Sequence, residues 1–148
     1  MRRLIFLLLF VLATGLAACS RGEPQLTVED ARGQPPVATV QLDLGDVPNG
    51  EIVTRNVPVR NAGDAVLVVE NISTSCGCTS ATLDPMQLVP GESGTLRIAY
   101  DAGAHGPELT GPMVRQVFIN SNDPAQPEVI VELAVNVTPP LQAESEGR

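Results

Sequence analysis

The chain has 148 residues, which fits one domain plus accessory segments. Its formal net charge is −8 at pH 7 and its charged residues are scattered, so it offers no positive footprint for nucleic acid. We therefore expect no nucleic-acid partner. We also expect no bound cofactor and no enzymatic activity, because no phosphate loop, carboxylate pair or zinc-protease motif is present.

The first eighteen residues differ from the rest of the chain. Met1-Arg2-Arg3 is a basic start, and an unbroken apolar run follows from Leu4 to Ala13. A membrane-spanning helix needs about 20 apolar residues. The run is shorter than that and matches the apolar centre of a secretory signal peptide. We predict a signal peptide at residues 1–18.

Leu16-Ala17-Ala18-Cys19 directly follows this segment and resembles the lipobox of bacterial lipoproteins. The resemblance implies that Cys19 becomes the new N-terminus, carries acyl chains and anchors the protein to a membrane of the cell envelope. Ser20 replaces the Asp that marks inner-membrane retention, which favours the outer membrane facing the periplasm in a Gram-negative cell. The alternative is an ordinary signal peptide, with Cys19 incidental.

Composition divides the rest of the chain into three parts. Residues 19–36 begin with the lipidated cysteine and are polar and proline-containing, so we predict a flexible tether. Residues 139–148 begin with two prolines and are predicted to be a disordered acidic tail. Residues 37–138 remain as the folded domain.

Within this domain, short segments of alternating apolar residues predict strands. They are separated by turns rich in Gly, Pro, Asn and Asp. Pro58 cannot donate a hydrogen bond to a neighbour, so its strand is predicted to be an edge strand or to contain a bulge. We expect strands at residues 38–44, 53–59, 66–72, 96–100, 117–119 and 129–137. Residues 83–89 are weakly patterned, and there we expect a short strand or a loop.

About seven short strands over roughly 100 residues are typical of an immunoglobulin-like sandwich. The chain has no Trp, and Tyr100 and Phe118 are the only aromatic residues after the signal peptide. It also lacks widely spaced cysteines that would link two sheets. We predict an all-β, immunoglobulin-like sandwich whose core consists of Val, Leu and Ile.

The order of the turn and cysteine motifs resembles the bacterial DUF1573 family over about residues 38–137. That family is similar to the immunoglobulin-like domains of ciliary and sperm proteins. The resemblance implies a fold and an envelope location, and it brings no established activity. The motifs that carry it are Gly45-Asp46-Val47-Pro48-Asn49-Gly50-Glu51, Val59-Arg60-Asn61-Ala62-Gly63-Asp64, Ser75-Cys76-Gly77-Cys78-Thr79, Leu88-Val89-Pro90-Gly91-Glu92-Ser93 and Ser121-Asn122-Asp123-Pro124.

Cys76-Gly77-Cys78 is the sharpest candidate for chemistry. Residues i and i+2 of a strand face the same side about 6.5–7 Å apart, and Gly77 allows a bend that brings the sulfurs closer. Three alternatives follow: a local redox-labile disulfide, a pair of thiolates for a soft metal such as Cu(I) or Zn, or small buried residues in a tight turn. Of these we favour the structural turn.

His105 is the only histidine in the chain and lies in a segment rich in glycine. With Met86 or Met113 it could complete a metal site at Cys76 and Cys78, but nothing in the spacing places it there. We therefore expect an exposed loop histidine and no metal site.

Together these observations predict a lipid-anchored envelope protein. Its domain acts as a non-enzymatic protein-binding or scaffolding module, and its partners are the membrane, through Cys19, and a protein of unknown identity. The alternative function is a thiol redox or soft-metal module that uses Cys76 and Cys78.

Overall fold

The structure is a computed structural model and describes residues 22–28 and 39–141. The predicted signal peptide, the lipidation site Cys19, residues 29–36 of the predicted tether and residues 142–148 of the predicted tail lie outside the described residues. Residues 139–141 are described and follow the last strand without forming regular structure.

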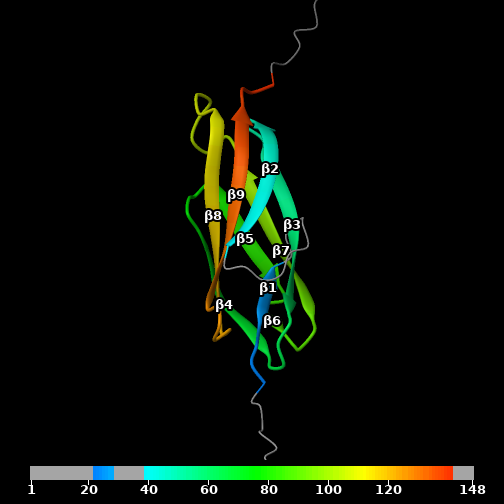
Figure 1. The fold of residues 1–148 in the computed structure, drawn as a ribbon. Coiled ribbons are helices and arrows are strands. Elements are labelled where there is room, and N and C mark those ends of the chain that lie inside the picture. Colours follow the sequence, from blue (N-terminus) through cyan, green and yellow to red (C-terminus); the bar gives the residue numbers. More distant parts are fainter. Residues whose placement is uncertain (1–21, 29–38, 142–148) are drawn as a thin grey trace, which may run out of the picture.

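Two sheets pack face to face as an elongated sandwich (Figure 1). One sheet has the order β1-β3-β7-β5 and the other β2-β9-β8-β4-β6. The described residues contain no helix, and therefore none that could span a membrane. The all-β sandwich predicted from the sequence is confirmed. The strands are β1 (Leu26–Val28), β2 (Thr39–Pro48), β3 (Ile52–Asn61), β4 (Leu67–Thr74), β5 (Thr79–Asp84), β6 (Gln87–Leu88), β7 (Ser93–Asp101), β8 (Gly111–Ser121) and β9 (Glu128–Thr138).

The core lies between the sheets and is built from strand residues of one parity. In β9 every odd-numbered residue from Val129 to Val137 is buried, while the even-numbered residues are partly or fully exposed. Side chains alternate between the two faces of a strand, so this pattern buries a continuous apolar stripe. The largest fully buried side chain is Tyr100, and Val, Leu and Ile make up most of the remainder, as predicted.

Strand β2 forms one edge of the five-stranded sheet and runs parallel to β9. Its register shifts between Asp43 and Gly45. Gly45 adopts a positive φ of 73°, which glycine tolerates best, and its N–H donates to Asp43 Oδ1 at 2.8 Å. The shift is a β-bulge that divides this edge into two parts.

Strand β1 corrects the prediction of a continuous flexible tether at residues 19–36. Leu26 and Val28 are buried in the core, and β1 pairs with residues 59–61 of β3. The carboxylate of Asp123 accepts a hydrogen bond from the Leu26 N–H at 2.8 Å. Two apolar residues on either side of Thr27 are too short a pattern to be recognised in a polar segment.

Two further predictions need correction. Among the described strands, none pairs with the outer side of β3 from Ile52 to Pro58, so this part is an edge, as Pro58 suggested. Residues 59–61 of β3 are not an edge, because β1 pairs with them. Strand β5 occupies Thr79–Asp84, where the sequence analysis expected the end of the cysteine block and the beginning of a weak strand. The polar Ser80 and Thr82 lie on the exposed face of β5 and hide its pattern.

Candidate functional site around the cysteine pair

The connection between β4 and β5 carries both cysteines from one sheet to the other. Thr74 Oγ1 donates to the carbonyls of Cys76 and Thr79 at 3.0 and 3.1 Å. On the outer side, Ser75 and Gln116 exchange two hydrogen bonds of 2.9 Å each. The Asp101 N–H donates to the Cys78 carbonyl at 2.8 Å. The connection is therefore fixed by both sheets.

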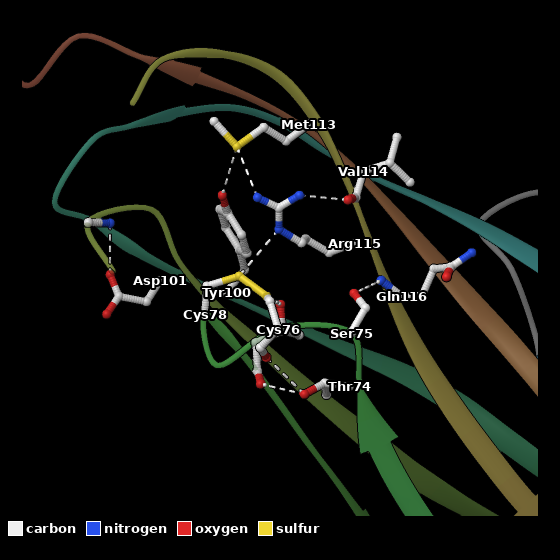
Figure 2. The surroundings of a disulfide bond; sticks show 12 residues. Thr74, Ser75, Cys76, Cys78, Tyr100, Asp101, Met113, Val114, Arg115 and Gln116 are labelled. Atoms are coloured by element: carbon white, nitrogen blue, oxygen red, sulfur yellow. Dashed lines mark hydrogen bonds between the residues drawn. A yellow bond between two sulfur atoms is a disulfide. The ribbon is translucent and has the colours of Figure 1, made fainter. Parts of the chain in front are cut away.

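The two cysteines are joined by a disulfide bond, with their Cα atoms 5.2 Å apart (Figure 2). Cys78 is 2 % exposed and Cys76 is half-buried. From the sequence we favoured small buried cysteines in a structural turn. The disulfide corrects that interpretation, because the two sulfurs are bonded to each other. Gly77 has open space where a Cβ would be and no positive φ, so the geometry does not require glycine there.

Polar groups approach the disulfide directly. The Nε–H of Arg115 donates to Cys78 Sγ at 3.3 Å, and Figure 2 shows the guanidinium above the sulfurs. The Thr79 hydroxyl lies 3.4 Å from Cys76 Sγ and 3.8 Å from Cys78 Sγ. The Arg115 guanidinium and the Thr79 hydroxyl can therefore stabilise a thiolate. A thiolate is the sulfur species that leaves when a thiol attacks the disulfide.

Arg115 also connects the disulfide to a methionine. Arg115 Nη2 lies 3.4 Å from Met113 Sδ, and the Tyr100 hydroxyl lies 3.7 Å from the same sulfur. Arg115 Nη1 donates to the Val114 carbonyl at 2.8 Å. These contacts hold the guanidinium in place over the disulfide.

The structure brings His105 to this site. The Sγ atoms of Cys76 and Cys78 and a ring nitrogen of His105 all lie within 4.8 Å of one another. His105 is exposed on the β7–β8 loop, as predicted, but spacing gave no sign that this loop reaches the cysteines. Of the two methionines considered, Met113 lies at the site and Met86 belongs to the β5–β6 turn.

Arg115 was missed by the sequence analysis. It has the same parity as the buried residues Val117 and Ile119, so its side chain points into the sandwich. An arginine at an inward-facing position is uncommon unless its guanidinium has a hydrogen-bond or charge partner. That parity is the signal that could have identified Arg115, although it could not have named Cys78 as its partner.

A separate groove of about 410 Å³ lies on the outer face of the five-stranded sheet, beside the β2 bulge. Val114 and Ala134 form part of its floor and are cross-strand partners. Asp43 and Asp46 line the β2 side. The groove therefore combines an apolar floor with an acidic margin.

Comparisons with known structures show the same fold. A protein of unknown function from Porphyromonas gingivalis W83 matches with a TM-score of 0.63 and 24 % identity, covering 78 % of this chain and 47 % of that one. The VesB protease of Vibrio cholerae matches with a TM-score of 0.57 and 15 % identity, covering 76 % of this chain and 32 % of that one. The chain thus spans about half of the first protein and a third of the second.

A third match is a single domain. The ASH/PapD-like domain 7 of human CEP192 has a TM-score of 0.53 and 8 % identity, covering 79 % of this chain and 87 % of that domain. These likenesses show an immunoglobulin-like sandwich of the ASH/PapD type. No curated protein sequence matches the chain significantly.

Comparison with known protein families agrees with the resemblance that the sequence motifs indicated. Residues 36–137 match the family described as "Protein of unknown function (DUF1573)". The match covers both sheets from β2 to β9, together with the cysteine pair, His105 and Arg115. The chain belongs to the DUF1573 family.

Proposed function

We propose that the domain is a non-enzymatic protein-binding module of the cell envelope, displayed on a membrane by lipid on Cys19. The observation that carries this proposal is the exposed edge of β2 beside the acidic groove. An exposed sheet edge can accept an extended segment of a partner protein as an added strand. The anchor serves to hold the module, and any protein that it binds, at the membrane.

Strand β2 offers an edge of limited length. No other described strand pairs with its outer side, so its backbone groups there can receive an added strand. The bulge at Gly45 and a hydrogen bond of 3.3 Å from Arg55 to the Leu44 carbonyl end this free stretch. Thr39 to Asp43 therefore form the available segment.

The groove indicates what the partner carries. Asp46 and Asp43 give its margin a negative charge, and Val114, which is 53 % exposed, gives it an apolar contact. The matching partner is an extended protein segment with an apolar residue and an Arg or Lys. Such a segment would pair with β2 and place its side chains in the groove.

Site-specific photo-crosslinking in living cells tests this proposal. With a photo-reactive aromatic residue in place of Val114, we expect a discrete crosslinked protein. Adding Asp46→Lys should lower its yield at least fivefold, because the margin then repels a basic segment. The same aromatic residue at Glu70, which is exposed on β4, should give no such product.

The charge change has its own control. Glu70→Lys alters the net charge equally but lies beside Asn120 and Ser121, at the other end of β8 from Val114, so it should leave the Val114 crosslink unchanged. An equal crosslink from Val114 and Glu70, or none from Val114, would contradict binding at the groove.

A second candidate function, thiol–disulfide exchange, is favoured by the groups around the disulfide. Cys76 is the more accessible sulfur, and Arg115 contacts only Cys78 among the two. A thiolate of a partner protein attacks Cys76 Sγ and forms a mixed disulfide, while the S–S bonding electrons leave on Cys78 as a thiolate. Arg115 stabilises that thiolate. A second partner thiolate then attacks the mixed disulfide, which leaves the partner oxidised and both cysteines reduced.

Trapping of mixed disulfides tests this order of attack. In the Cys78→Ser variant Cys76 has no internal partner, so we expect it to accumulate mixed disulfides with envelope proteins. In the Cys76→Ser variant the buried Cys78 should trap at least fivefold less. Equal trapping by the two variants would contradict Cys76 as the attacked sulfur, and no trapping by either would contradict exchange.

A further inference from the structure

We propose that the reduced cysteine pair binds one Cu(I) ion, held by Cys76 Sγ, Cys78 Sγ and the imidazole of His105. This inference goes beyond the protein-binding function and does not depend on it. It shares with thiol exchange the two cysteines, Arg115 and the requirement that the disulfide can be reduced. A metal site of this kind would make the domain a redox-gated copper carrier.

The three donor atoms already lie close enough to share an ion. All lie within 4.8 Å of one another in the disulfide form. Metal–sulfur bonds of about 2.3 Å and metal–nitrogen bonds of about 2.0 Å place the donors of a three-coordinate ion roughly 3.7–4.0 Å apart. His105 lies on an exposed loop, so a movement of about 1 Å closes the remaining distance. Reduction lets the two bonded sulfurs separate to this distance by rotation of the cysteine side chains. The backbone of the pair stays held by β4, β5 and β7, and the exposed loop adjusts the position of His105.

The oxidation state of the pair decides whether the site exists. Disulfide sulfurs are neutral and bonded to each other, whereas thiolates are the form that binds metals. A protein dithiol supplies the reduction: its two sulfurs become a disulfide while Cys76 and Cys78 become thiols. Binding of Cu(I) to the two thiols then releases two protons. Exchange with a protein disulfide would reverse these steps: that disulfide takes up two electrons and two protons to become a dithiol, Cys76 and Cys78 form their disulfide again, and the Cu(I) ion is released.

The donor set points to Cu(I). Two thiolates and an imidazole form a soft set, and Cu(I) favours soft ligands at low coordination number. A closed zinc site has four ligands. Among the described His, Cys, Asp and Glu residues the cluster contains only three. The thioether of Met113, which Arg115 connects to Cys78, adds a third soft sulfur beside the site.

Arg115 supplies the charge balance. A Cu(I) ion with two thiolates and a neutral imidazole carries a net charge of −1. The guanidinium that donates to Cys78 Sγ at 3.3 Å offsets this charge without using a metal-binding position. Groups that hydrogen-bond to ligand atoms commonly orient and tune metal sites in this way. The exposed side, at His105, leaves a route for the ion.

Competition for Cu(I) with a chromogenic chelator tests the proposal. The full chain is reduced with a phosphine, freed of reductant without oxygen, and titrated with bathocuproine disulfonate as competitor. We expect one Cu(I) per reduced chain and none per oxidised chain. His105→Gln should weaken binding at least tenfold. The matched control is Glu108→Gln, because Glu108 is exposed on the same loop and offers no soft ligand.

X-ray absorption of the copper-loaded protein gives an independent readout that does not rely on a variant. We expect two sulfur ligands and one nitrogen ligand. Failure of the reduced chain to bind, equal binding by the oxidised chain, or unchanged affinity in His105→Gln would overturn the proposal. Displacement of Cu(I) by equimolar Zn(II) would overturn the choice of copper. None of these results affects the Val114 crosslink, so the two proposals fail separately.

Discussion

At the scale of single residues, Arg115 has the largest predicted effect on chemistry. Its Nε–H donates to Cys78 Sγ, and it is partly buried between the sheets. A hydrogen bond to a charged group contributes about 1.5–3 kcal/mol, and partial exposure places this one toward the lower end. The contact stabilises the reduced pair more than the disulfide, because only the reduced pair carries a negative sulfur.

Arg115→Gln should therefore favour the disulfide. We expect the equilibrium with dithiothreitol to shift roughly tenfold toward the oxidised form, which lowers the reduction potential by about 30 mV. Thiol alkylation across a series of dithiothreitol ratios measures the shift. Arg97→Gln removes an exposed arginine from β7 and should leave the equilibrium unchanged. A shift toward the reduced form in Arg115→Gln would contradict the assigned role.

At the scale of elements, the attachment of β1 depends on a turn in another part of the chain. Gly63 lies against the backbone of residues 23–25, and a Cβ there would overlap the Glu23 carbonyl oxygen. The Asp64 N–H donates to that oxygen at 2.9 Å, and the Ala62 N–H donates to the Gln25 carbonyl at the same distance. The turn thus serves as the docking site for the segment before β1.

Gly63→Ala should loosen β1 while leaving the rest of the sandwich folded. Leu26 and Val28 would lose buried contacts, and we expect a loss of about 2–3 kcal/mol in the free energy of unfolding. Hydrogen exchange should show faster exchange at Leu26–Val28, and urea unfolding gives the energy. Gly77→Ala is the control, because a Cβ there meets no neighbour. Unchanged exchange at β1 in Gly63→Ala would contradict this account.

The same elements show what the sequence could reveal. Regular alternation predicted β9 and the inward faces of β7 and β8, because burial on one face imposes a period of two. It could not reveal β1, whose two apolar residues are stabilised by Asp123 and by the Gly63 turn, both far away in the chain. For the same reason spacing identified the cysteine pair but not its long-range neighbours His105 and Arg115.

At the scale of the whole molecule, β1 changes the expected position of the domain at the membrane. A flexible tether through residue 36 would allow a reach of roughly 55–60 Å. The described chain already contacts the sandwich at Gly22, three residues after Cys19, so a lipid on Cys19 would lie within a reach of about 10 Å from that point. The chain enters at the end of the sandwich where Asp123 contacts Leu26.

The cysteine site lies toward the other end. Strand β4 leads to it, β5 departs from it, and the β7–β8 loop that carries His105 lies near the end where β9 stops (Figure 1). A lipid on Cys19 would therefore hold the Asp123 end near the bilayer. The cysteine pair and His105 would face away from the membrane, where partner proteins and metal carriers can reach them.

This arrangement rests on the lipid, which a Cys19→Ala variant tests. Palmitate labelling in growing cells should be lost, and the chain should move from the membrane fraction to the soluble envelope fraction. Loss of the acyl chains removes the apolar contribution of about 0.8 kcal/mol per buried CH₂ that would hold the chain at the membrane. Cys76→Ser is the matched control, because it removes a cysteine that the disulfide uses and should keep the label. Equal labelling of Cys19→Ala and the unmodified chain would contradict lipidation at Cys19, and the proposed orientation of the cysteine site would fall with it.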